Sequence, residues 1–233
     1  MLAHSAPYLA LHIPDGFLSA PVCIITWAIA AGMLWWIIQT VQKDYQERLV
    51  PLMGVCAAFI FAAQMINFPV PGGTSGHLLG GTLAAILLGP WAGCLVMAVV
   101  VTVQALFFQD GGIMVLGANI LNMGLATTLI SFYGVRLLRF WLGRNRWQVM
   151  AIATGSLAWL SVMVAAVLTA LQLGASGTIP LTVALPVLLL WHSLIGVGEA
   201  VITILVVQSL WRTRPDLFFD PPRLPRSVTS PPL

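Results

Sequence analysis

Apolar residues in this chain run in long, almost unbroken stretches, without the polar alternation of an amphipathic helix or strand. A helix needs about 20 apolar residues to cross a bilayer, and all the stretches except the third reach or approach that length. The pattern therefore predicts an all-α polytopic membrane protein with about seven transmembrane helices. The seven stretches cover residues 21–41, 50–67, 77–89, 91–108, 115–139, 148–172 and 183–211.

The third stretch is short and rich in glycine, and Gly89-Pro90 separates it from the fourth. The two stretches are therefore either a true pair of helices or one broken unit. Short segments interrupted by Gly or Pro are where transporter folds often place their substrate.

Charged side chains make up only 7% of the chain, against about 25% in a soluble domain. With the N-terminus outside and seven crossings, every Lys and Arg falls on the inner side, in agreement with the positive-inside rule. We therefore expect an outside N-terminus and an inside C-terminus in a plasma (inner) membrane. The excess of basic residues is explained by this topology and does not indicate a nucleic-acid partner. The ten residues are Lys43, Arg48, Arg136, Arg139, Arg144, Arg146, Arg212, Arg214, Arg223 and Arg226.

The two ends of the chain differ from the apolar domain at residues 11–212. Residues 1–10 form an N-terminal extension that lacks the basic region of a signal peptide. Residues 213–233 are rich in proline and predict a disordered cytoplasmic tail. The cysteines lie far apart in apolar stretches and predict neither a disulfide nor a metal site; they are Cys23, Cys56 and Cys94.

The four histidines gather toward one membrane face in this topology. His4, His12 and His77 fall on the outer side, and His192 lies in the outer half of the last stretch. Neutral imidazole is a good ligand for nickel, cobalt, copper and zinc. A single histidine of this kind is often only an interfacial or packed residue, so the surrounding motifs matter.

Two motifs surround His12 and His77. Residues 11–19 read LHIPDGFLS, in which proline and Asp-Gly favour a shaped loop over a helix start. Residues 64–81 read QMINFPVPGGTSGHLLGG, whose glycines allow the backbone to pass close to a ligand.

These motifs resemble those of the CbiM/NikM family, the substrate-binding (S) components of energy-coupling-factor (ECF) cobalt and nickel transporters. The resemblance covers roughly residues 11–211 and implies a seven-helix bundle with its N-terminus outside, in agreement with the charge distribution. It continues through LLGPWA at 87–92, VQAL at 103–106, DGG at 110–112, LGANILNM at 116–123 and HSLIGVGEA at 192–200.

The resemblance also implies a metal site at the amino terminus. In the family, a free α-amine, the amide nitrogen of the next residue, which is histidine, and that histidine's imidazole give three nitrogens. A second histidine gives the fourth. The matching positions here are Leu11, His12 and His77. Four nitrogens in a plane suit Ni(II), whereas zinc prefers a tetrahedral site.

The chain departs from the family pattern because Leu11 is preceded by ten residues, and an internal leucine has no free amine. Three explanations stay open. Translation starts at position 11, or cleavage after Ala10 frees the amine, or the extension is real and His4 or another group replaces the amine.

Other polar residues in or near the apolar stretches are candidates to orient the ligands or to pack around them. A ligating imidazole needs a partner on its second nitrogen. Glu199 lies seven residues after His192, on the same helix face, and we expect a structural hydrogen-bonded pair or relay within the bundle. The remaining candidates are Asp15, Gln64, Asn67, Gln104, Asp110, Asn119 and Asn122.

The expected function is thus that of a non-enzymatic S component that takes up nickel or cobalt ions as substrate. The resemblance implies ECF ATPase subunits, a coupling transmembrane subunit and a small accessory membrane subunit as partners. The chain itself has no GxxxxGK[ST] motif for ATP. The alternatives are an S component for an organic, vitamin-like substrate and a membrane metalloenzyme. The chain contains neither HExxH nor GxSxG, and a link to cobalamin synthesis depends on neighbouring genes.

Overall fold

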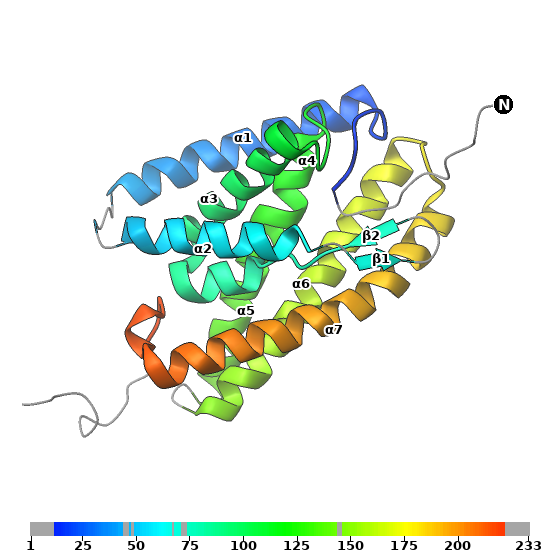
Figure 1. Cartoon of the computed structure of the whole chain (residues 1–233). Coiled ribbons are helices and arrows are strands. Elements are labelled where there is room, and N and C mark those ends of the chain that lie inside the picture. Colours follow the sequence, from blue (N-terminus) through cyan, green and yellow to red (C-terminus); the bar gives the residue numbers. More distant parts are fainter. Residues whose placement is uncertain are drawn as a thin grey trace, which may run out of the picture.

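The structure, a computed structural model, describes residues 12–43, 47, 49–66, 68–70, 74–143 and 146–221. These residues form a bundle of helices (Figure 1). Between α3 and α6, one helical run is divided into α4, a π-helical segment η1 and α5. The helices are α1 (Ala20–Lys43), α2 (Leu49–Gln64), α3 (Gly81–Phe108), α4 (Leu116–Asn119), η1 (Ile120–Ala126), α5 (Thr127–Leu142), α6 (Trp147–Ala175) and α7 (Leu181–Thr213).

Five helices in the described part are long and apolar enough to cross a membrane, namely α1, α3, the run Leu116–Leu142, α6 and α7. The predicted helical membrane fold is confirmed to this extent. One feature departs from the all-α prediction. Strands β1 (Phe68–Val70) and β2 (Thr74–Gly76) form a small antiparallel hairpin. The sequence pattern did not predict it, because strands of three residues are too short to show a period.

Helix α3 folds back on itself at Gly89. Gly89 has φ 77° and ψ −175°, a conformation open to glycine but costly for other residues. A Cβ atom added to Gly93 would lie 3.1 Å from the carbonyl oxygen of Ala84, although nine residues of straight helix span about 13 Å. Residues 81–88 and 90–108 are therefore two arms that lie side by side, which answers the question left open by the third and fourth stretches.

A short C-terminal segment completes this turn. Pro90 has no N–H, so the carbonyl of Ile86, four residues earlier, loses its helical partner. The backbone N–H of Phe219 donates to that carbonyl at 3.1 Å. Sequence reasoning assigned the chain from 213 onward to a disordered tail, which is wrong for residues 213–221. Thr213 ends α7 and the 3-10 turn η2 (Pro215–Leu217) follows it; residues 222–233 lie outside the described part.

The bundle has two distinct ends. At the end called here the histidine end, the loops at residues 12–19, 77–80 and 109–115 come together (Figure 1). At the opposite end, called the arginine end, a cavity of about 970 Å³ is lined by Lys43, Arg136 and Arg214.

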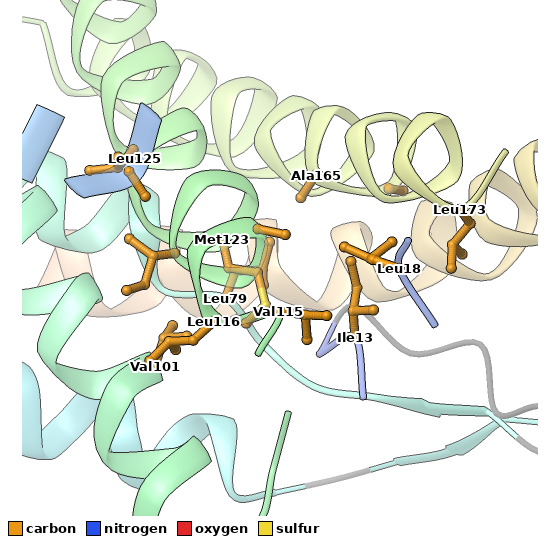
Figure 2. Packing of buried hydrophobic residues seen from close by; sticks show 14 of the residues in the cluster. Ile13, Leu18, Leu79, Val101, Val115, Leu116, Met123, Leu125, Ala165 and Leu173 are labelled. Carbon is orange, nitrogen blue, oxygen red and sulfur yellow. The ribbon is translucent and has the colours of Figure 1, made fainter. Parts of the chain in front are cut away.

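Buried apolar residues form two clusters, of which one supports the histidine end (Figure 2). Ile13 and Leu79 come from the loops that carry the two histidines, and both are at most 1% exposed. They pack with residues such as Val115, which precedes α4, and Met123 and Leu173 from the helices. The loops are thus anchored in the core on both sides of the site.

Candidate metal centre

The first loop is fixed to the bundle at Ile13, the residue after His12. The N–H of Ile13 donates to Oδ1 of Asn119 at 3.0 Å, and Nδ2 of Asn119 donates back to the Ile13 carbonyl at 3.1 Å. That carbonyl also accepts the N–H of Gly112 at 2.9 Å. Asn119 is fully buried, so its two bonds hold the backbone next to His12 in one place.

Asp15 fixes the same loop from its other side. Its carboxylate accepts the N–H groups of Ile113 at 3.1 Å and Met114 at 2.8 Å. Gly112 lies so close to this turn that an added Cβ would be 2.3 Å from the backbone nitrogen of Asp15. The hydroxyl of Thr178 donates to the carbonyl of Phe17. Asp15 and Asn119 were candidates from sequence, and both act through the backbone near His12.

The second loop is held by side chains from two other helices. The N–H groups of Leu79 and Gly80 each donate to one carboxylate oxygen of Glu199 in α7, both at 2.8 Å. Nε2 of Gln64 in α2 donates to the Leu79 carbonyl at 2.5 Å. Glu199 is 1% exposed, and its partners are backbone groups two and three residues after His77.

The two loops bring His12 and His77 together. Their ring centroids are 4.6 Å apart, with 35° between the ring planes, and each residue is 3% exposed. Nδ1 of His12 lies 2.7 Å from Oδ1 of Asp110, and Nδ1 of His77 lies 2.8 Å from the carbonyl oxygen of Leu78.

A carbonyl only accepts hydrogen bonds, so the proton of the neutral His77 ring sits on Nδ1 and its lone pair on Nε2. Among the described residues, neither Nε2 atom has a hydrogen-bond partner, although both are buried. Two basic nitrogens without partners are therefore held within one small region.

The electrostatics keep His77 in the form that binds metal. Burial first, and then the neighbouring His12, lower the pKa of His77 to about 4. His77 is therefore neutral near pH 7, as a metal ligand must be. Burial alone would raise the pKa of Asp110, but the contact with His12 outweighs it and holds that pKa below its usual value.

Side chains alone do not complete a metal site in the described part of the chain, where no group of three or more His, Cys, Asp or Glu residues is placed to hold an ion. Any further ligands must come from the main chain or from residues outside the described ranges. His4, Leu11 and Asn67, three of the residues singled out from sequence, lie outside these ranges.

Three other candidates from sequence, Gln104, Asn122 and His192, form no hydrogen bond with either histidine of the site among the described residues. Both carboxamide atoms of Gln104 are buried and have no partner among the described residues. Asn122 exchanges two hydrogen bonds, of 2.7 and 2.8 Å, with Gln172 of α6. His192 bonds through Nδ1 to the Leu188 carbonyl at 2.7 Å, so it is not paired with Glu199 as expected.

Sequence reasoning missed Gln172 and Thr178. Gln172 was visible as an amide at the end of the sixth apolar stretch. A polar group in such a place usually has a partner on another helix.

Comparison with known proteins identifies the family. Residues 12–217 match the model of the CbiM family, described as the cobalt uptake substrate-specific transmembrane region. The chain belongs to the CbiM family. The family predicted from the motifs is thus confirmed.

Relatives of this CbiM-family chain are named as transport proteins. It is 41% identical over 210 residues to the putative fused nickel transport protein NikMN of Archaeoglobus fulgidus, covering 89% of this chain and 68% of that protein. It is 37% identical to a putative metal transport protein of Haloquadratum walsbyi, covering 90% and 94%. With the cobalt transport protein CbiM of Sorangium cellulosum the identity is 31%, over 72% and 76%.

Solved structures agree with this assignment. The crystal structure of a truncated transition metal transporter superposes with a TM-score of 0.78 at 35% identity, covering 86% of this chain and 98% of that one. A second transition metal transporter gives 0.76 at the same identity, covering 86% and 92%. The CbiM-family chain is therefore a multi-pass membrane protein of a cobalt and nickel transport family, and not an enzyme.

Proposed function

We propose that this chain is the metal-binding membrane subunit of an ECF-type transporter that takes up nickel or cobalt, with His12 and His77 as ligands. One observation carries the proposal: two buried imidazole rings lie with their centroids 4.6 Å apart, and Nε2 of His77 has no partner in the described part of the chain. Imidazole nitrogen without thiolate suits Ni(II) and Co(II), the metals of the family.

The full ligand set in this proposal is an amino-terminal clamp. The amine of Leu11, the amide nitrogen and imidazole of His12, and the imidazole of His77 give four nitrogens. An imidazole that chelates together with its own amide nitrogen uses Nδ1, because Nε2 points away from the backbone. Nδ1 of His12 lies against Asp110 here, so closing the clamp exchanges the Asp110 contact for the metal.

The proposed topology has seven crossings, with the histidine end outside and the arginine end inside. The seven crossings are α2, the two arms of α3 and the four other long helices, which are α1, Leu116–Leu142, α6 and α7. The cations at the arginine end support the orientation. The domain at residues 11–212 then works with ECF ATPases, a coupling membrane subunit and a small accessory subunit. In this proposal, residues 1–10 are absent from the mature protein.

The ligand assignment is tested by metal content and calorimetric nickel and cobalt titration of the purified full chain. His12→Ala and His77→Ala should each abolish binding of one ion per chain. His192→Ala is the matched control, because His192 is equally buried but bonded to its own helix. A wild-type chain that takes up neither metal contradicts the proposal and favours an organic, vitamin-like substrate.

The clamp is tested separately by the intact mass of protein purified from its native host, measured with its metal content. A species that begins at residue 11 and carries one metal ion supports the amine ligand. A full-length species that binds the metal equally well contradicts the amine ligand, and His4 becomes the first candidate to replace it.

A further inference from the structure

Glu199 links α7 to the loop that carries His77. Each of its carboxylate oxygens accepts one backbone N–H, from Leu79 and from Gly80, at 2.8 Å. Both side-chain oxygens of Glu199 therefore act as acceptors. Among the described residues, no Lys or Arg is paired with Glu199, so these two N–H groups are the donors that offset its burial.

The loop needs this support because its backbone is not helical. Inside a membrane bundle, an unpaired N–H or C=O group costs several kcal/mol. Glu199 satisfies two of these groups, and Gln64 satisfies the Leu79 carbonyl. Gly80 has φ 80°, and an added Cβ would meet the Ile60 side chain at 2.8 Å. The course of the loop is thus fixed by α2 and α7 together.

This fixed course determines where His77 lies. Leu79 is fully buried in the apolar cluster and is two residues from His77. Within its own loop, the His77 ring contacts the Leu78 carbonyl through Nδ1. The position of Nε2 relative to His12 therefore depends on the backbone that Glu199 holds.

We propose that Glu199 is the positioning residue of the metal-binding loop, and that its two hydrogen bonds set the place of His77 that a planar nitrogen site requires. This inference rests on the proposed function. Partners that orient a metal ligand typically affect metal affinity by about 10–100-fold. A displaced His77 harms a planar Ni(II) site more than it harms binding of Zn(II), which prefers a tetrahedral arrangement.

The test uses the full chain in detergent and compares Ni(II) and Zn(II) affinities with thermal unfolding of the metal-free protein. Glu199→Gln keeps the side-chain length but offers only one acceptor oxygen. We expect it to weaken Ni(II) binding by about tenfold or more and Zn(II) binding by less. Glu199→Asp retains two acceptor oxygens and should recover part of the preference for Ni(II). The absorption bands of bound Ni(II) should shift in Glu199→Gln, because they report ligand geometry.

Arg139→Met is the matched control. Arg139 is also a buried charged residue, and it contacts Asp220 at the arginine end, with Nη1 donating to the Asp220 carbonyl at 3.2 Å. The Arg139→Met variant should lower the unfolding temperature and leave the Ni(II)-to-Zn(II) affinity ratio unchanged. If Glu199→Gln and Arg139→Met each weakened Ni(II) and Zn(II) binding equally, the role of Glu199 would be purely structural and the inference would be overturned.

The two proposals fail in different ways. If the wild type binds no metal, or if His77→Ala binds like the wild type, the proposed function fails. If the wild type binds, His77→Ala does not, and Glu199→Gln keeps both the affinity and the spectrum of the wild type, only the positioning role is overturned.

Discussion

The two ends of the bundle hold their non-helical backbone by different means. At the histidine end, side chains from distant helices do so: Asn119 binds Ile13, and Glu199 binds Leu79 and Gly80. At the arginine end, a backbone N–H closes the turn of α3, since Phe219 donates to the carbonyl of Ile86, and one side chain, Arg139, bonds the Asp220 carbonyl. Side chains fix a loop at chosen points and leave ring nitrogens of the site unpaired, whereas the backbone bond closes a turn of the main chain.

This difference gives a common assay for variants at either end. A ligand at 100 times its Kd stabilises the folded state by about 2.7 kcal/mol. Unfolding temperature is therefore measured with and without nickel. Variants at the histidine end should lose this nickel-dependent increase, and variants at the arginine end should keep it.

We expect the largest effect from Gly112→Ala. The new Cβ would collide at 2.3 Å with the backbone nitrogen of Asp15, and overpacking of this kind costs about 3 kcal/mol. The loop with His12 should move, so the unfolding temperature falls and the nickel-dependent increase disappears. Gly32→Ala is the control, because nothing lies within 4 Å of its added Cβ. A folded Gly112→Ala protein that binds nickel normally would contradict the described packing.

Asn119→Ala should come next. It leaves the N–H of Ile13 buried without an acceptor, at a cost of about 2 kcal/mol, while the Ile13 carbonyl keeps Gly112 as a donor. The unfolding temperature should fall, and nickel affinity should fall with it, as measured by titration calorimetry. If affinity stays unchanged while stability falls, the bonds to Ile13 serve the bundle alone.

Gly89→Ala tests the arginine end and should have a smaller effect. Its Cβ would lie 2.5 Å from the ring of Phe219, and an alanine at φ 77° adds about 1–2 kcal/mol of backbone strain. The unfolding temperature should fall while the nickel-dependent increase stays intact. Phe219→Ala in the same chain should relieve the collision but not the strain, so the double variant recovers only in part. Full recovery would mean that Gly89 matters for space alone.

The smallest effect is expected from Asp216→Asn. Arg214 and Asp216 form an ion pair at 2.8 Å, but both side chains are about 60% exposed, and such pairs contribute little. Neither the unfolding temperature nor its dependence on nickel should change measurably. A clear fall in unfolding temperature would show that the surface pair, as well as the Phe219 bond, holds the C-terminal segment.

Sequence predicted the helices closely because bilayer thickness sets their length. The stretch at 21–41 became Ala20–Lys43, and that at 183–211 became Leu181–Thr213. The sequence left the relation between the third and fourth stretches open, because a Gly-Pro pair breaks a helix without giving the direction of the next helix. The order in 213–221 was missed because the tail is polar and rich in proline, while the carbonyl it bonds lies far away in sequence.

Sequence singled out candidate residues for the site but not their contacts. Family resemblance singled out His12 and His77, and the structure places them together. Periodicity put Glu199 and His192 on one face of the same helix, but the structure gives each of them a different partner. Helical spacing describes neighbours within one helix and not the loop that packs against it. For the same reason, nothing in the sequence linked Asp15 to Met114.

The bond between Phe219 and Ile86 also bears on the order in which the protein is made. Synthesis runs from the N-terminus, so the turn at Gly89 is complete in sequence long before Phe219 is added. Until then, the Ile86 carbonyl lacks this donor. The arginine end is therefore the last part of the bundle to reach its final form. A ribosome stalled before Phe219 holds a chain in which the arm of α3 at residues 81–88 lacks this bond.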